Sequence, residues 1–251
     1  MKEVVPNRAG TCKFVDGEFS LFPMTLIRPQ SGTMHRKIAF TKYTLAAFCV
    51  GLLAVMVSES AGALPDLKIN RNLLVRSVEV QFRDFSADSC AVIEGCVPGP
   101  GFHKIMMFDA SIANIGTGDL KIGDPAARTN LFHFSECHGH YHMKGFSSYR
   151  LLNSSGTEVR RSRKQGFCLR DNRPFLADAP PASGYDCDNQ GISRGWQDIY
   201  DKSLDCQFLD VTGIPPGRYQ LQIIVNPLRL LKESNYDNNA VTVPVTIPRL
   251  H

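Results

Sequence analysis

Three histidines at alternate positions are the feature that most constrains the fold of this chain. His138, His140 and His142 lie within the stretch 131–149, LFHFSECHGHYHMKGFSSY. In a β-strand, residues i, i+2 and i+4 share one face, whereas a helix would distribute the three rings around its circumference. The spacing therefore predicts a strand that presents three imidazoles on one side, as a metal site would require. The alternative is a polar strand with this face in solvent.

The strand has to bend if the three imidazoles are to bind one metal ion. In an ideal strand, the first and third histidines are about 13 Å apart. Metal–nitrogen bonds are only about 2 Å long. Gly139 is the expected place for the bend, because glycine adopts backbone conformations that other residues avoid. Imidazole suits both copper and zinc, so the histidines alone do not identify the metal.

The chain from residue 64 onward has the pattern of an all-β protein. Apolar and polar residues alternate in short segments separated by turns rich in Gly, Pro and Asn, at 75–82, 105–112, 119–122, 149–152, 218–226 and 240–247. This pattern predicts an antiparallel β-sandwich-like core. Pro244 places the last segment at a sheet edge. The polar segment 171–196 is typical of a long irregular loop with a functional role.

The first 63 residues have the pattern of a leader. Arg36, Lys37 and Lys42 precede an apolar run at 45–57 and small residues at 61–63. This order is typical of a secretory signal peptide, and the run is short for a membrane span. A membrane anchor is the alternative. We expect a dubious N-terminal extension at 1–33, a signal at 34–63 and a domain at 64–251, with no membrane span in the mature, secreted chain.

Six cysteines follow the expected cleavage site, and an even number in an exported chain indicates disulfides. They are Cys90, Cys96, Cys137, Cys168, Cys187 and Cys206. Their number alone leaves the pairing open. Residues 64–251 carry 21 Lys and Arg against 20 Asp and Glu. This balance gives no basic surface that would argue for nucleic-acid binding.

Seven short motifs occur in order along residues 64–249. They are PDL at 65–67, CAVIEGC at 90–96, CHGHYH at 137–142, RKQGFCL at 163–169, DIYDKSLDCQFLD at 198–210, PPGRY at 215–219 and VNPLRLLKESNYDNN at 225–239. In this order the segment resembles the catalytic domain of the lysyl oxidase family. The resemblance implies an extracellular copper-dependent amine oxidase. It would use molecular oxygen to convert primary amines, either peptidyl lysine or small amines, to aldehydes, with release of hydrogen peroxide and ammonia.

The resemblance also implies a cofactor made from the protein's own side chains. His138, His140 and His142 match the histidines that bind copper. Lys164 and Tyr200 match the two residues that cross-link to form lysine tyrosylquinone. Taken singly, a lysine in a basic run is ordinarily a solvated charge and a tyrosine is ordinarily a core residue. Lys164 lies four residues before Cys168, and Tyr200 lies six residues before Cys206. The two spacings together favour the cofactor.

The catalytic base is not fixed by the resemblance. Asp198, two residues before Tyr200, is the first candidate, and the alternative for it is a surface or capping carboxylate. His133 is the second candidate.

A calcium site is implied by the resemblance as well. The matching ligands are Asp66, the carbonyl of Leu67, Glu233, Asn235, Asn238 and Asn239. Carboxylate and amide oxygens suit calcium. Asn235 replaces an acidic residue, which lowers the charge of the site. The alternative is an Asn-rich turn without a metal.

The cysteines and one residue pair depart from the family pattern. Cys90–Cys96 and Cys137–Cys187 match disulfides of the family, whereas Cys168 and Cys206 lack their usual partners. We therefore predict that these two pair with each other. Phe134-Ser135 replaces an aromatic–histidine pair that precedes the copper motif.

A non-catalytic protein is the alternative function. It would be a metal-binding extracellular adhesion or structural domain that keeps the β-sandwich and loses turnover. The presence of both Lys164 and Tyr200 favours the enzyme, because a structural domain has no need of that pair.

Overall fold

The computed structural model describes residues 62–163 and 167–249. Strands dominate this part of the chain, and its two helices are short, α1 (Arg71–Ser77) and α2 (Cys90–Ile93). The all-β prediction is therefore confirmed. Neither described helix has the length and apolar character needed to cross a membrane. The extension at 1–33 and nearly all of the signal expected at 34–63 lie outside the described residues.

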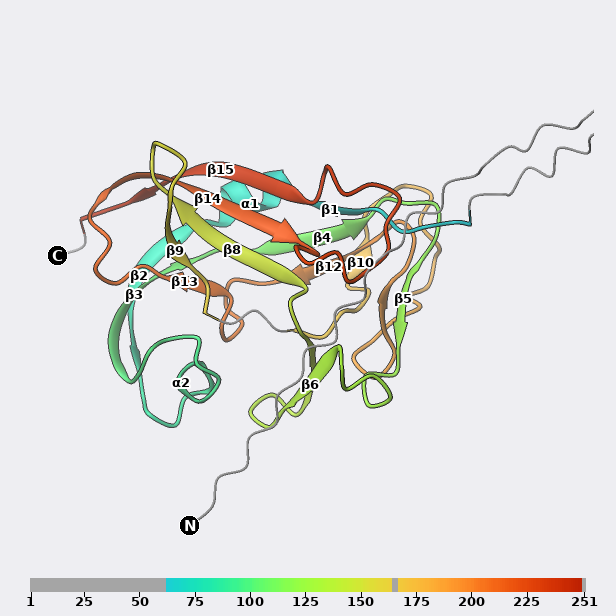
Figure 1. Cartoon of the computed structure of the whole chain (residues 1–251), viewed down its shortest axis with the longest axis horizontal. Helices are drawn as coiled ribbons and strands as arrows, with labels where there is room; N and C mark the ends of the chain where they lie inside the picture. The colour runs from blue at the N-terminus through green and yellow to red at the C-terminus, as the bar shows by residue number, and fades with distance from the viewer. Residues whose placement is uncertain (1–61, 164–166, 250–251) are drawn as a thin grey trace, which may run out of the picture. The chain divides into compact units, whose positions relative to one another are not determined.

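Two four-stranded antiparallel sheets form the main layers (Figure 1). One has the order β1 (Leu67–Ile69), β4 (Ala110–Asn114), β12 (Trp196–Tyr200) and β10 (Arg173–Pro174). The other has the order β15 (Ala240–Ile247), β14 (Gly217–Val225), β8 (Ser147–Leu152) and β9 (Glu158–Arg161). A three-stranded sheet has the order β13 (Phe208–Asp210), β3 (Gly101–Met107) and β2 (Glu79–Phe85). Two further sheets have two strands each: β11 (Gln190–Ile192) pairs with β5 (Leu120–Gly123), and β6 (Phe132–Ser135) pairs with β7 (His140–Met143).

A common apolar core joins the two larger sheets. Alternate residues of β14 and β15 are buried, among them Leu221 and Val243, and they share one cluster with Ile112 of β4 and Tyr149 of β8. Burial of each such aliphatic side chain contributes about 1.5–3 kcal/mol to stability. The alternation of apolar residues thus produces the sandwich-like core that the sequence predicts. Pro244 lies in β15, which is an edge strand, as predicted.

Two strand predictions need correction. The strand expected at 75–82 begins only at Glu79 as β2, because residues 75–77 belong to α1. The Asn70 side chain caps this helix by accepting a hydrogen bond of 3.2 Å from the Leu73 backbone N–H, which favours helix over strand. The segment 105–112 is divided between β3 and β4, so it is not one continuous strand.

All six cysteines form disulfides, as predicted, but the predicted pairing is wrong. The bonds are Cys90–Cys137, Cys96–Cys206 and Cys168–Cys187. Cys90 is the first residue of α2 and Cys96 lies three residues after the end of α2, and each bonds to a different part of the chain. Cys206 bonds to Cys96 within a small buried cluster, so it does not pair with Cys168. Cys168 instead bonds to Cys187, in the irregular loop that precedes β11.

Candidate functional site

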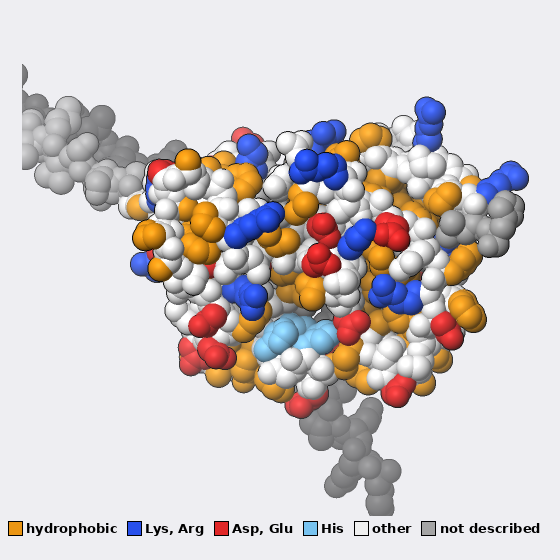
Figure 2. Space-filling view, turned by 180° about the vertical axis from the view of Figure 1, so that it is seen from behind, with side chains coloured by type: hydrophobic (Ala, Val, Ile, Leu, Met, Phe, Trp, Pro, Cys, Tyr) orange, Lys and Arg blue, Asp and Glu red, His pale blue; other side chains and the backbone are white. Residues whose placement is uncertain are grey.

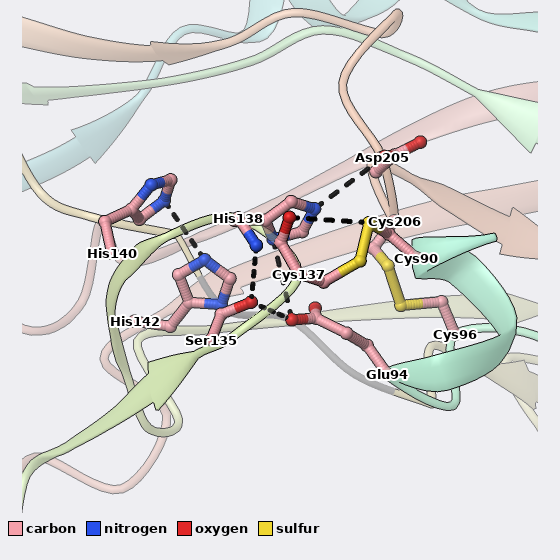
Figure 3. A network of polar contacts seen from close by, with 10 residues as sticks. All are labelled: Cys90, Glu94, Cys96, Ser135, Cys137, His138, His140, His142, Asp205 and Cys206. Carbon is pink, nitrogen blue, oxygen red and sulfur yellow. Dashed lines mark hydrogen bonds and ion pairs between the residues drawn. A yellow bond between two sulfur atoms is a disulfide. The ribbon is translucent and has the colours of Figure 1, made fainter. Parts of the chain in front are cut away.

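The three histidines converge at the hairpin formed by β6 and β7 (Figure 3). His140 and His142 lie on β7, whereas His138 lies in the preceding turn, so the three do not share a single strand. Gly139 supplies the predicted bend, with a φ of 68° in the left-handed region that favours glycine. The ring centroid of His142 is 5.1 Å from that of His138 and 4.8 Å from that of His140.

The histidine cluster has the geometry and protonation that a metal ion requires. The Nε2 atoms of His140 and His142 are 3.1 Å apart. Two ligands of one ion with bonds of about 2 Å approach each other to about 3 Å. Burial lowers the pKa of His142 to about 3 and also lowers that of His140, which keeps both rings in the neutral, metal-binding form. The other ring nitrogen of His142, Nδ1, is buried and has no hydrogen-bond partner among the described residues, and a single ion would bind only one of the two nitrogens. These residues therefore fit a metal ion.

Tyr200 and Asp198 lie on the buried face of β12. Because they are two residues apart on a strand, both side chains point toward the core between the sheets. The Tyr200 hydroxyl donates a hydrogen bond of 2.5 Å to Asp198 Oδ2. Burial raises the pKa of Asp198 to about 7, and burial together with the nearby Asp198 charge raises the pKa of Tyr200 well above 10. The placement of Asp198 suits a proton acceptor beside the phenol, and its role as the base stays a prediction.

Phe167 connects the tyrosine to the histidines. Its ring stacks on Tyr200 with a centroid distance of 4.7 Å and an interplanar angle of 27°. Its centroid is 6.3 Å from that of His142. Sequence reasoning did not single out Phe167, although it lies within the motif 163–169. Lys164, three residues earlier in the sequence, lies outside the described residues.

An open cleft of about 390 Å³ borders the tyrosine, and its lining includes His140, Phe167, Arg170, Asp198, Tyr200 and Asp201. An adjoining hollow of about 320 Å³ is lined by His138, His140, Phe167, Ser203, Leu204 and Asp205. Because His140 and Phe167 line both hollows, a small molecule in the cleft would contact both the phenol and one histidine of the cluster. Figure 2 shows histidine side chains gathered at one place on the surface, with acidic side chains beside them. A larger hollow of about 680 Å³ contains none of the residues predicted for catalysis.

His133, the second candidate for the base, lies on β6 opposite His142. The two ring centroids are 5.3 Å apart. His133 is therefore placed against the histidine cluster, and it does not line the cleft beside Tyr200. This arrangement favours Asp198 as the group that would act on a substrate there.

Glu233 organises the residues predicted to bind calcium. Its Oε2 accepts a hydrogen bond of 2.8 Å from the Leu67 backbone N–H. Its Oε1 accepts hydrogen bonds from the side-chain amides of Asn226 and Asn239, at 2.6 and 2.8 Å. Burial raises the pKa of Glu233. The loop 232–239 is thus joined to the beginning of β1, far away in the sequence.

Five of the six residues predicted to bind calcium lie in this region, Leu67 through its N–H rather than its predicted carbonyl. Asn238 Nδ2 donates a hydrogen bond of 2.7 Å to Asp66 Oδ1. The Oδ1 atoms of Asn238 and Asn239 are buried and have no hydrogen-bond partner within the described part of the chain. Such oxygens suit a cation. Asn235 differs, because it is exposed and its Oδ1 accepts a hydrogen bond of 2.9 Å from the Asp237 backbone N–H.

Comparison with known proteins agrees with the motif order. The family model for lysyl oxidase matches residues 65–248. Lysyl oxidase homolog 2 of Bos taurus is 34% identical over 197 residues, which cover 74% of this chain and 24% of that protein. Lysyl oxidase homolog 3B of Danio rerio is 32% identical over 223 residues, covering 84% of this chain and 26% of that protein. The chain thus matches about a quarter of the length of these relatives.

A solved structure of the CARDB domain of a Pyrococcus furiosus protein superposes on 73% of this chain with a TM-score of 0.29 at 11% identity. So low a score does not indicate a common fold. The family model, by contrast, extends across nearly all of the described residues, and the sequence relatives agree with it. The chain belongs to the lysyl oxidase family.

Proposed function

We propose that this protein is a secreted, copper- and quinone-dependent amine oxidase that converts primary amines to aldehydes and releases hydrogen peroxide and ammonia. One observation carries the proposal. The buried Tyr200–Asp198 pair borders the same cleft as His140, and Phe167 stacks on Tyr200 and lies beside His142. An adhesion domain would have no use for a buried phenol and carboxyl that open toward a metal-binding cluster.

His138, His140 and His142 would hold the copper, which with oxygen supplies the oxidation that makes the cofactor. Lys164 and Tyr200 would form lysine tyrosylquinone, which supplies an electron sink for the oxidation of an amine. The neutral imidazoles of the cluster are ready to bind the ion without first losing a proton.

Asp198 would accept the proton from the amine-bearing carbon of the substrate. A base is most effective when its pKa lies near the working pH, and burial brings the pKa of Asp198 to about 7. Phe167 would orient the ring of residue 200 and keep water from the ring face against which it stacks. Both residues line the cleft, so each would act directly where the amine binds.

Two exposed carboxylates near the cleft would favour a cationic substrate, with Arg170 as a cation in the same lining. Asp201 borders the cleft and Asp205 borders the adjoining hollow, and both side chains are exposed. Exposed carboxylates attract an alkylammonium group before it enters the cleft. The open form of the cleft is compatible with a lysine side chain that projects from a protein as well as with a small amine.

Secretion is part of the proposal. We assign residues 34–63 as a signal peptide and 64–251 as the catalytic domain. All six cysteines of that domain are disulfide-bonded, which is typical of proteins folded in an oxidising compartment. N-terminal sequencing of the secreted protein should begin at Leu64, and a mature chain that still contained residues 34–63 would contradict the assignment.

Spectroscopy and peroxide release test the oxidase directly. Copper-loaded, aerated protein should develop a visible quinone band, form a coloured adduct with phenylhydrazine, and release peroxide when given a primary amine. Protein kept free of copper is the control and should show none of the three. Copper-replete protein that lacked all three signals would favour the adhesion alternative.

We also propose that calcium binds the loop 232–239 together with Asp66. Saturation at about a hundred times the dissociation constant stabilises a protein by about 2.7 kcal/mol, or about 5–10 °C in melting temperature for a domain of this size. Calcium should therefore raise the melting temperature of the wild type, and Asp66→Asn should remove most of this increase. Asp237→Asn, on an exposed side chain of the same loop, is the matched control. Equal melting temperatures with calcium and with chelator would exclude the site.

A further inference from the structure

Glu94 is a buried carboxyl next to the histidine cluster, on the turn that follows α2. Its side chain is only 6% exposed. Two disulfides fix this turn, since Cys90 bonds to Cys137 and Cys96 bonds to Cys206. Cys137 immediately precedes His138 in the sequence. The short α2 segment is therefore anchored covalently to the histidine turn, and Glu94 lies between the two anchors (Figure 3).

The contacts of Glu94 point it at the histidines. Glu94 Oε1 is 3.6 Å from His138 Nδ1. The Ser135 hydroxyl donates a hydrogen bond to the same carboxylate oxygen and accepts one of 3.1 Å from the His138 backbone N–H. One oxygen of Glu94, one nitrogen of His138 and one nitrogen of His142 all lie within 4.8 Å of one another. These three atoms are close enough together for one ion to bind them, and His140 adjoins the group through its contact with His142.

Charge gives a reason for a carboxylate at this place. A divalent ion bound only by neutral imidazoles keeps its full charge in a partly buried site, and burial of an unbalanced charge is costly. A buried carboxylate is costly for the same reason. When the metal ion and the carboxylate lie together, the charge of each compensates that of the other. Copper(II) accepts mixed nitrogen and oxygen ligands. Asp205 is a weaker candidate, because its side chain is 51% exposed and its Oδ2 is 3.7 Å from His138 Nε2.

We infer that Glu94 is a fourth protein ligand of the copper centre, supplying a carboxylate oxygen beside His138 and His142. This inference rests on the proposed copper site. The Ser135 hydroxyl would orient the carboxylate, and the two disulfides would keep the turn of Glu94 at a fixed position relative to the histidine turn. The motif CAVIEGC would thus provide a copper ligand, Glu94, in addition to its two disulfide-bonded cysteines.

Substitution of Glu94 tests the inference by metal affinity rather than by activity. Glu94→Gln keeps the size of the side chain and removes its charge. Its copper(II) dissociation constant, measured by competition with a chelator, should rise at least about tenfold. The electron paramagnetic resonance spectrum of the bound copper should also change. Glu136→Gln is the matched control, because Glu136 is exposed in the same hairpin turn, and it should bind copper as the wild type does. An unchanged affinity and spectrum in Glu94→Gln would overturn the inference.

A measurement on the wild type covers the case in which Glu94→Gln does not fold. Protein labelled with carbon-13 glutamate and loaded with copper(II) should show a carbon-13 coupling in electron–nuclear double resonance, and the absence of that coupling would overturn the inference. His142→Ala separates this result from a failure of the proposed function. If His142→Ala binds copper as tightly as the wild type, the copper site itself is wrong. If it loses copper while Glu94→Gln does not, only the role of Glu94 is wrong.

Discussion

Replacing Tyr200 by Phe will abolish amine oxidation and the visible quinone band. Phe keeps the ring that stacks on Phe167 but lacks the oxygen from which a quinone carbonyl would form. Peroxide release should therefore fall to the background of protein without copper. The intact mass of copper-loaded, aerated Tyr200→Phe should equal the mass expected for its sequence with three disulfides, whereas the wild-type mass should differ from the corresponding value because of oxidation and cross-linking.

Tyr219→Phe is the control for this substitution. Tyr219 lies on β14 and donates a hydrogen bond of 3.0 Å to the Pro215 carbonyl. Tyr219→Phe therefore removes one hydrogen bond, as Tyr200→Phe does. A net hydrogen bond contributes about 1 kcal/mol, which both variants should tolerate. Tyr219→Phe should retain the quinone band and activity. A Tyr200→Phe protein that kept the band would place the cofactor on another residue and refute the assignment.

Local periodicity explains which parts of the site could be predicted from the sequence. Asp198 and Tyr200 are two residues apart, and any strand through them puts both on one face. The same rule brought His140 and His142 together on β7, and the conformational freedom of Gly139 accounts for the bend. These placements follow from residues within a few positions of one another. They needed no knowledge of how the strands pack.

Contacts between distant segments explain what could not be predicted. The partner of Cys96 is 110 residues away, and only the packing of β13 beside β3 brings Cys206 to it. Resemblance suggested a local Cys90–Cys96 bond, but the helical turn of α2 directs the two thiols to different segments. Glu94 was missed for the same reason. Nothing in the spacing of CAVIEGC shows that its carboxyl meets histidines more than forty residues later.

Replacing Asp198 by Asn will leave the quinone band in place and lower turnover by about 10²–10⁴-fold, the usual contribution of a general base. The amide preserves the volume of the buried side chain and a hydrogen-bond partner for residue 200, but it does not accept a proton. Steady-state peroxide release should show the loss in kcat. Asp188→Asn, on an exposed side chain of the loop before β11, should keep wild-type turnover. Turnover of Asp198→Asn at the wild-type rate would exclude Asp198 as the base.

The pH dependence separates a catalytic role of Asp198 from a structural one. Because burial raises its pKa to about 7, turnover should fall about tenfold for each pH unit below 7 as the carboxylate gains a proton. Stability should change in the opposite direction. Between about pH 4 and 7 the folded protein retains a proton that the unfolded chain has lost, so the free energy of unfolding should decrease as the pH rises through this window. The test compares the melting temperatures of copper-free wild type and Asp198→Asn from pH 4 to 8. The melting temperature of the wild type should fall more over this range than that of the variant. Parallel curves would indicate that Asp198 does not titrate in this range.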